Sequence, residues 1–266
     1  MHLKLTTGKN ERSLVPEGFE PITQYQTADI FIVGYPKSGN TWFQNLASGI
    51  VYGVDPRFSP PVLVDDLVPD VHYKKYYRRY STPMYFKSHF LPQAAYRRVV
   101  YLVRDGRDAM VSYFHYLEGT QKRKIDFLKM VTTGAELFPG KWHQHVEAWM
   151  ANPHGAEMMI IKYEDLILDP LPQLEKFCQF ASLERDKSFL EHVIEASDFN
   201  SLRKKEAAMG MGRTDWPAGK SFFRRGKVGS YRDEMPEAVQ RAFEKEAGEA
   251  LACFDYDYGP ATKSLR

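Results

Sequence analysis

The fold is decided by the stretch Asp29-Ile-Phe-Ile-Val-Gly34-Tyr-Pro-Lys-Ser-Gly39-Asn40-Thr41. Its apolar run predicts a buried parallel strand, because strands covered on both faces are apolar throughout. Glycines follow the run, and apolar residues then recur with helical spacing over 40–52. A strand, a glycine turn and a helix in this order direct the N–H groups of the first helical turn at an anion. We therefore expect an anion-binding loop at residues 34–41.

Strands and helices alternate along the rest of the chain. Apolar runs predict further strands at 84–87, 98–103 and 157–161. Periodic apolar residues predict helices at 105–117, with Asp105 as N-cap, and at 135–150, 171–181, 187–196 and 236–251. Such alternation predicts the α/β class, with a single doubly wound parallel sheet and helices on both faces. We expect one domain over 1–266, with an N-terminal extension at 1–28 and a lid loop at 203–221.

Composition excludes several classes of protein. The chain has 266 residues and a formal net charge of +2, which argues against nucleic acid as a partner. The N-terminus lacks the pattern of a signal peptide, and no apolar run is long enough to span a bilayer. Cys178 and Cys253 have no metal-binding spacing and are interpreted as reduced structural thiols. We expect a cytoplasmic protein without a membrane partner.

Two more stretches carry clustered positive charge. Arg104 ends the strand at 98–103, and Ser112 follows about two helical turns later, so both side chains can hold one phosphate. Alternatively, Arg104 and Arg107 pair with Asp105 and Asp108 as surface ion pairs. Residues 221–229 read Ser-Phe-Phe-Arg-Arg-Gly-Lys-Val-Gly, where consecutive arginines beside glycine predict a third anion site.

The loop is similar to a known family of nucleotide-binding loops. Gly34–Thr41 has the spacing of the P-loop, except that Asn40 replaces the usual lysine and Lys37 lies at the loop tip. Tyr35-Pro-Lys-Ser-Gly-Asn-Thr-Trp42 closely resembles the phosphosulfate-binding loop of the cytosolic-type sulfotransferases. These enzymes use 3′-phosphoadenosine 5′-phosphosulfate (PAPS). The resemblance runs from Ile30 to Gly229, with the family's motifs in order.

The resemblance implies both an activity and a set of binding residues. The activity is transfer of a sulfuryl group from PAPS to a hydroxyl or amine of a small-molecule acceptor, without a metal. The residues implied for the phosphosulfate and adenine at the loop are Lys37, Ser38, Gly39, Asn40, Thr41 and Trp42. Those implied for the 3′-phosphate are Arg104, Ser112, Phe222, Arg224, Arg225 and Gly226. Those implied for contacts around the adenine are Tyr163, Ser197 and Phe199.

Catalytic residues are expected at the end of the strand at 84–87. Lys87-Ser-His89-Phe-Leu-Pro92 resembles the family's K-T-H-x-x-P pattern, which supplies the catalytic histidine. A histidine titrates near neutral pH and suits the role of general base for in-line transfer, which we assign to His89. Lys87 would neutralise the sulfuryl oxygens, and Lys37 the bridging oxygen. His115 is the alternative base.

Other interpretations stay open. A P-loop kinase using ATP and Mg²⁺ would need a lysine at position 40 and an aspartate at a strand end, for which Asp165 is the candidate. A non-catalytic adenosine-nucleotide-binding protein would keep the loops without needing Lys87 and His89.

The acceptor and the oligomeric state are not predicted. The basic, tyrosine-rich run at 73–80 is either functional or a solvated helix face. The functional interpretations are an acceptor-binding or capping segment and a patch for an anionic partner. Apolar and aromatic side chains would favour an apolar acceptor, whereas Asp65, Asp66 and Asp70 would select a cationic one. The C-terminal dimer motif of the vertebrate enzymes is not found after Tyr231.

Overall fold

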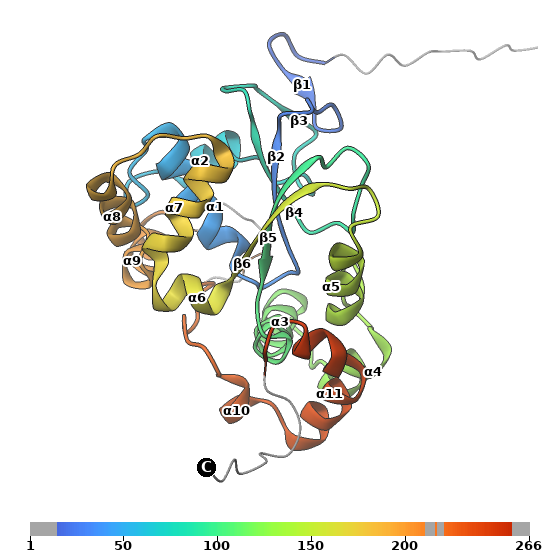
Figure 1. Ribbon diagram of the computed structural model, residues 1–266. Coiled ribbons are helices and arrows are strands. Elements are labelled where there is room, and N and C mark those ends of the chain that lie inside the picture. Colours follow the sequence, from blue (N-terminus) through green and yellow to red (C-terminus); the bar gives the residue numbers. More distant parts are fainter. Residues whose placement is uncertain (1–14, 211–215, 217–220, 257–266) are drawn as a thin grey trace, which may run out of the picture.

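The computed structural model describes residues 15–210, 216 and 221–256. Its central sheet has parallel strands in the order β4-β2-β5-β6 (Figure 1). The strands are β2 (Ile30–Gly34), β4 (Tyr85–Ser88), β5 (Arg98–Val103) and β6 (Glu157–Lys162). The predicted parallel sheet is confirmed, with β2 at its centre between β4 and β5.

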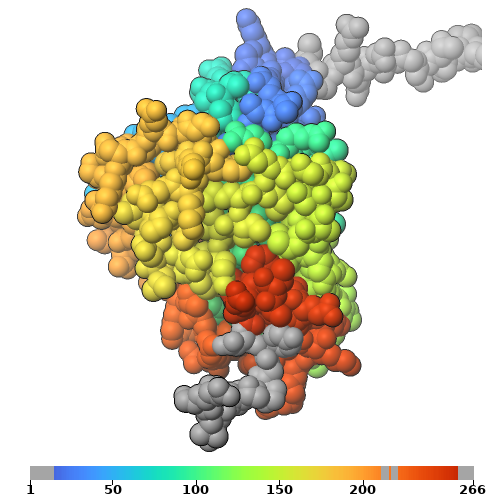
Figure 2. Space-filling model, viewed as in Figure 1, coloured from blue at the N-terminus to red at the C-terminus, as the bar shows by residue number. Residues whose placement is uncertain are grey.

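Helices cover both faces of the sheet, as predicted (Figure 1). On one side lie α1 (Asn40–Tyr52), α2 (Pro61–Leu67), α6 (Tyr163–Leu168), α7 (Pro170–Ala181), α8 (Lys187–Ala196) and α9 (Phe199–Met209). On the other lie α3 (Gly106–Gln121), α4 (Phe127–Thr133), α5 (Trp142–Ala151), α10 (Tyr231–Glu234) and α11 (Glu237–Ala252). Helix α11, red in Figure 2, packs against α3, α4 and α5.

The alternation of side chains along β2 explains why its sequence is apolar throughout. Ile30 and Ile32 belong to the core beneath α1, α7 and α8, whereas Phe31 and Val33 belong to the core beneath α3, α5 and α11. All four side chains are fully buried. Successive residues of a strand point to opposite faces, so a sheet with two covered faces requires apolar residues at every position.

Some helix predictions were wrong. The helix predicted at 135–150 begins only at Trp142, and a separate helix, α4, precedes it. Gly134 ends α4 with a φ of 74°, and Gly140 has a φ of 151°, so both glycines interrupt the helical path. Helices α2, α4, α6, α9 and α10 were not predicted. Helix α9 includes residues 203–209 of the expected lid loop, and 211–215 and 217–220 lie outside the described residues.

Part of the expected N-terminal extension is packed into the fold. Strand β1 (Glu20–Pro21) pairs antiparallel with β3 (Tyr76–Tyr77), so the basic run at 73–80 contains a short strand rather than a helix. The Tyr25 ring contacts the Phe31 ring at a centroid distance of 4.8 Å.

The two cysteines differ in burial. Cys178 is buried and Cys253 is exposed, and both are free thiols, so only Cys178 fits the structural role expected of both. None of the helices in the described ranges combines the length and the apolar character that crossing a bilayer requires.

Candidate active site

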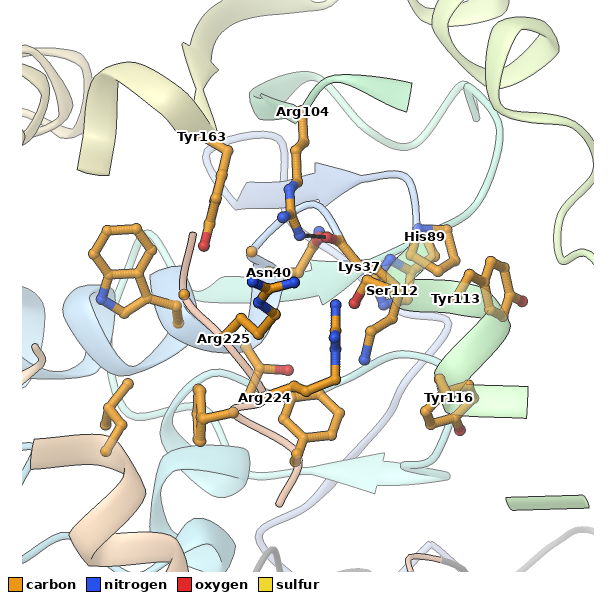
Figure 3. Close-up of a pocket in the computed structure, with 18 of the residues that line it drawn as sticks. Lys37, Asn40, His89, Arg104, Ser112, Tyr113, Tyr116, Tyr163, Arg224 and Arg225 are labelled. Carbon is orange, nitrogen blue, oxygen red and sulfur yellow. Dashed lines mark hydrogen bonds between the residues drawn. The ribbon is translucent and has the colours of Figure 1, made fainter. Parts of the chain in front are cut away.

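All four strands of the central sheet end at one edge, and a candidate site residue follows each end. Lys37 follows β2, His89 follows β4, Arg104 follows β5 and Tyr163 follows β6. These four residues line one cavity of about 430 Å³ (Figure 3). Ligands of open α/β sheets bind in this position, outside the carboxyl ends of the strands.

The loop after β2 has the backbone of an anion-binding turn. Lys37 and Gly39 have φ values of 73° and 94°, and α1 begins immediately afterwards. A Cβ atom on Gly39 would lie 2.7 Å from the Tyr163 ring, so only glycine fits there. The Ser38 hydroxyl is buried and has no hydrogen-bond partner among the described residues. An unpaired buried hydroxyl is costly, and a bound anionic oxygen would satisfy it.

Aromatic side chains form the next part of the cavity. The Trp42 and Tyr163 rings meet edge to face at 5.8 Å, and Phe199 packs against Gly226. Trp42 Nε1 donates a hydrogen bond of 2.9 Å to the Ser197 carbonyl. Ser197 itself is fully buried and does not line the cavity. Its side chain is therefore not placed as expected, and its backbone instead holds Trp42.

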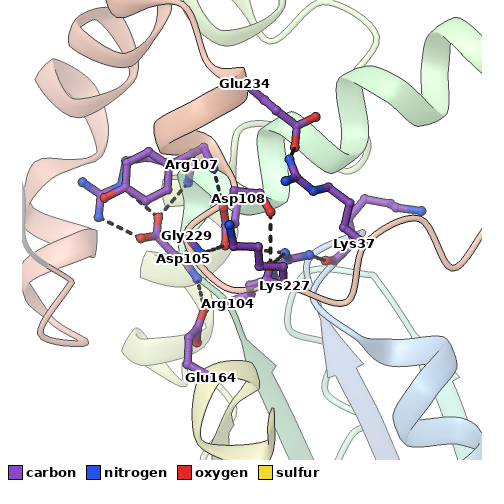
Figure 4. A network of polar contacts seen from close by, with 12 residues as sticks. Lys37, Arg104, Asp105, Arg107, Asp108, Glu164, Lys227, Gly229 and Glu234 are labelled. Atoms are coloured by element: carbon purple, nitrogen blue, oxygen red, sulfur yellow. Dashed lines mark hydrogen bonds and ion pairs between the residues drawn. The ribbon is translucent and has the colours of Figure 1, made fainter. Parts of the chain in front are cut away.

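Arg104 connects the loop after β2 to the loop that carries the third basic stretch. Its Nη1 donates to the Lys37 carbonyl at 3.1 Å and its Nη2 to the Lys227 carbonyl at 3.4 Å (Figure 4). The guanidinium lies 4.4 Å from the centre of the Tyr163 ring, and its Nε is buried without a partner among the described residues. This nitrogen also suits an anionic ligand.

The ion pairs expected as an alternative also exist. Arg104 lies 3.6 Å from Asp108, and Arg107 lies 2.7 Å from Asp105 (Figure 4). Arg107 also pairs with Glu244 at 2.9 Å and does not line the cavity. The structure thus separates the two arginines, because Arg104 alone has a ligand-facing position.

Arg224 and Arg225 converge on one carboxylate that the sequence analysis missed. Glu234 accepts hydrogen bonds of 2.5 and 3.0 Å from Arg224 and of 2.5 Å from Arg225. His115 Nε2 lies 2.9 Å from the same carboxylate. Burial alone would raise the pKa of Glu234, but these hydrogen bonds outweigh it and lower the pKa to about 2. The carboxylate is therefore ionised and holds both arginines at the cavity.

His89 is fixed in one tautomer. Its Nδ1 lies 2.7 Å from the Gly34 carbonyl oxygen, which can only accept, so Nδ1 carries the proton. Nε2 is then the atom that can accept a proton. The backbone N–H of His89 donates to His72 Nε2 at 2.8 Å, and the two rings stack at 5.4 Å. Burial, and then the Lys87 charge, lower the pKa of His89 to about 4.

Lys87 lies between the anion-binding loop and a buried acid. Its Nζ is 3.3 Å from Thr41 Oγ1 and pairs with Asp70 at 3.0 Å. Asp70 and Lys87 both line the cavity. Burial raises the pKa of Asp70, but the Lys87 and His89 charges outweigh it, and the pKa is lowered. The ionised Asp70 carboxylate thus lies beside Lys87 and the loop.

The structure brings most of the predicted site residues together. Those that line the cavity are Lys37, Gly39, Asn40, Thr41, Trp42, Lys87, His89, Arg104, Ser112, Tyr163, Phe199, Phe222, Arg224, Arg225 and Gly226. Ser38 and Ser197 are buried next to it.

Two residues that the sequence offered as alternatives, His115 and Asp165, lie outside the cavity. His115 pairs with Glu234 and does not line the cavity. Asp165, the metal-binding candidate of the kinase hypothesis, is exposed on α6 and does not line it either.

The chain is similar to known proteins over most of its length. Flavonol 3-sulfotransferase of Flaveria bidentis is 28% identical over 257 residues, covering 83% of this chain and 82% of the relative. Sulfotransferase 2A1 of Rattus norvegicus is 28% identical over 250 residues, covering 85% of each. The crystal structure of retinol dehydratase in complex with androsterone and inactive cofactor PAP has a similar fold. Its TM-score is 0.66 at 21% identity, covering 90% of this chain and 84% of that one. The family model of the sulfotransferase domain matches residues 27–255, and the chain therefore belongs to the sulfotransferase family.

Proposed function

We propose that this sulfotransferase moves the sulfuryl group of PAPS to a hydroxyl or amine of a small-molecule acceptor, with His89 as general base. One observation carries the proposal: the loop after β2, the arginines of two other segments and His89 line the same cavity. The PAP (3′-phosphoadenosine 5′-phosphate) in the retinol dehydratase complex supports an adenosine nucleotide as the ligand. A cytoplasmic location is proposed with it, since the family resembled is of the cytosolic type.

The chain offers a partner to each part of such a nucleotide. The N–H groups at the start of α1, the Ser38 hydroxyl and Lys37 would hold the phosphosulfate. The 3′-phosphate would be held by Arg104, Ser112, Arg224 and Arg225. The aromatic residues flanking the adenine would be Trp42, Tyr163 and Phe199.

The transfer step needs one base and several cations. His89 Nε2 takes the acceptor's proton while the acceptor oxygen or nitrogen forms its bond to sulfur. The bond from sulfur to the bridging oxygen breaks, and its electron pair leaves on the 5′-phosphate of PAP. Lys37 stabilises that developing charge, and Lys87 stabilises the sulfuryl oxygens. Positioning and electrostatics then supply the catalysis.

Replacing His89 tests the assignment of the base. We expect His89→Ala to reduce kcat by roughly a hundredfold or more, because general-base catalysis contributes about that factor. The measurement is transfer from radiolabelled PAPS to a panel of phenols, alcohols and amines, with PAP affinity measured in parallel. PAP affinity should stay within about twofold, and the exposed His154→Ala variant should match the wild type. Full activity of His89→Ala would remove this residue from the mechanism.

A nucleotide competition separates this function from the kinase alternative. Arg104 and Arg225 predict that PAP binds more tightly than ATP without added Mg²⁺, because only PAP carries a 3′-phosphate. Isothermal titration with each nucleotide measures the difference. Tighter ATP binding that depends on Mg²⁺ would favour the kinase.

A further inference from the structure

A second cavity of about 500 Å³ adjoins the first. Thr41, Asp70, Tyr73 and Lys87 line both cavities, so the second opens on the same lysine that lies beside the anion-binding loop. Helices α1, α2 and α9 supply most of its other walls. A molecule that extends from the transfer site past Lys87 would enter this space.

Six charged side chains line the second cavity, and most of them have partners. These side chains are Asp65, Asp70, Lys74, Lys87, Lys205 and Glu206. Asp70 and Lys87 pair with each other at 3.0 Å, and Lys74 pairs with Asp66 at 2.5 Å. Glu206 accepts hydrogen bonds from the backbone N–H groups of Phe222 and Phe223.

Asp65, Lys205 and Glu206 have no ion pair among the described residues, but only Glu206 has both carboxylate oxygens hydrogen-bonded to backbone N–H groups. Asp65 Oδ1 accepts only from Gln44 Nε2 at 3.0 Å, and Lys205 Nζ donates to Asn45 Oδ1 at 2.7 Å. Gln44 and Asn45 are consecutive on α1, and consecutive helical residues point in different directions. The two charges are thus held apart by neutral amides instead of neutralising each other.

Both unpaired charges are substantially desolvated. Burial raises the pKa of the Asp65 carboxyl more than the nearby Lys87 charge lowers it. Burial also lowers the pKa of Lys205 to about 8, although the Asp55 charge acts in the opposite direction. A buried charge whose hydrogen-bond partner is neutral is destabilised by desolvation, and an opposite charge on a ligand would stabilise it. Two such charges of opposite sign in one cavity indicate a ligand with two charges.

We propose that the second cavity binds the distal part of the sulfuryl acceptor, and that this acceptor is a zwitterion. Its positive group pairs with Asp65 and its negative group with Lys205, while its hydroxyl or amine reaches His89. The inference rests on the proposed sulfuryl transfer and adds the class of acceptor to it.

Four phenols that share the reacting hydroxyl test the proposal. They are p-ethylphenol (neutral), tyramine (cationic), p-hydroxyphenylpropionate (anionic) and tyrosine (zwitterionic). We expect kcat/KM to rise roughly tenfold with each matched charge, which is the scale of a hydrogen bond to a charged group. Tyrosine should therefore be the best acceptor and p-ethylphenol the poorest.

Two variants assign the charges to residues. Asp65→Asn should abolish the advantage of tyramine over p-ethylphenol and leave that of p-hydroxyphenylpropionate. Lys205→Gln should do the opposite. Matched controls are Asp165→Asn on the exposed side of α6 and Lys204→Gln on the exposed side of α9, because neither residue lines the first or the second cavity. PAP affinity and thermal unfolding show that each variant is folded.

The outcomes separate this inference from the proposed function. Equal kcat/KM for all four phenols, or variants that behave like their controls, would overturn the zwitterion while sulfuryl transfer stands. The zwitterion would also be overturned if the PAP-loaded protein neither bound nor sulfated any charged phenol while it sulfated other acceptors. Absence of PAP binding and of transfer to any acceptor would overturn the proposed function itself.

Discussion

At the scale of single residues, we expect His89 to determine how the site responds to pH. Its Nδ1 proton is held by the Gly34 carbonyl, so Nε2 can accept a proton without a change of tautomer. Burial and then Lys87 lower its pKa to about 4, whereas Asp70 and the Gly34 hydrogen bond act in the opposite direction. The imidazole is therefore neutral and able to accept a proton at physiological pH.

This pKa predicts the acidic limb of the pH profile. The base acts only when unprotonated, so activity is lost as pH falls through the pKa of His89. We expect kcat/KM to stay level from about pH 8 to pH 6 and to fall toward about pH 4, below the ordinary histidine value of about 6.5. Asp70→Asn should move the acidic limb to a still lower pH, because the Asp70 carboxylate raises the pKa of His89. A limb centred near 6.5 in the wild type would contradict the prediction.

At the scale of elements, helix α1 begins and ends at glycines in the left-handed region. Gly39, its N-cap, has a φ of 94°, and Gly53, its C-cap, has a φ of 69°. A Cβ on Gly39 would strike the Tyr163 ring, whereas one on Gly53 meets nothing within 4 Å. Replacing either glycine with alanine therefore strains the backbone similarly, but only at position 39 does the added Cβ meet another side chain.

The pair gives a controlled prediction. Gly53→Ala should cost about 1 kcal/mol of unfolding free energy, from strain alone. Gly39→Ala should cost more, roughly 2–3 kcal/mol, and should weaken PAP binding at least tenfold, because Tyr163 and the anion-binding loop must move. Denaturant unfolding and PAP titration measure the two effects. Equal losses in both variants would show that the Tyr163 contact is unimportant.

The segment carrying Arg224 and Arg225 is tied to α10 by Glu234. That carboxylate occupies the guanidinium groups that the proposed function assigns to a phosphate. Ligand binding must therefore compete with Glu234 or share the arginines with it.

Removing this charge should strengthen nucleotide binding. We expect Glu234→Gln to raise PAP affinity roughly two- to fivefold, the effect of about 0.5–1 kcal/mol, since a partly exposed ion pair contributes little more. Titration calorimetry at two salt concentrations measures the change. The exposed Glu237→Gln variant is the control. A loss of affinity would mean that Glu234 positions the arginines rather than competing for them.

At the scale of the whole molecule, one sheet joins two cores. Val146 belongs to the core under α5, and Leu174 belongs to the core under α7. Strands β2 and β5 contribute side chains to both, so neither core can form without the sheet. We infer that the described part of the chain unfolds as one domain.

Calorimetry checks this inference. Val146→Ala and Leu174→Ala should each lower the midpoint of a single transition, because each deletes buried methyl groups; the leucine change should cost roughly 2–5 kcal/mol. Leu168→Ala, at a side chain that is 86% exposed, should change stability by less than about 0.5 kcal/mol. Two separate transitions, each affected by one core variant only, would show two domains.

The sequence by itself determined the strand, turn and helix at 29–52 and the positions of Arg104 and His89. These features are local, because apolar runs, glycines and strand ends are visible within a few residues. The break between α4 and α5 was visible in principle, since Gly134 and the Pro139-Gly140 pair precede Trp142.

Only the tertiary structure decided which partners the charged side chains have. Lys227 lies 123 residues from Arg104, and Lys205 lies 160 residues from Asn45, yet each pair is within hydrogen-bond distance. No local pattern in the sequence marked Glu234 as the partner of Arg224 and Arg225. None marked Asp65 as a carboxylate without an ion pair. The physical reason is that charge pairing depends on distance and burial in space, which the packing of the helices on the sheet sets.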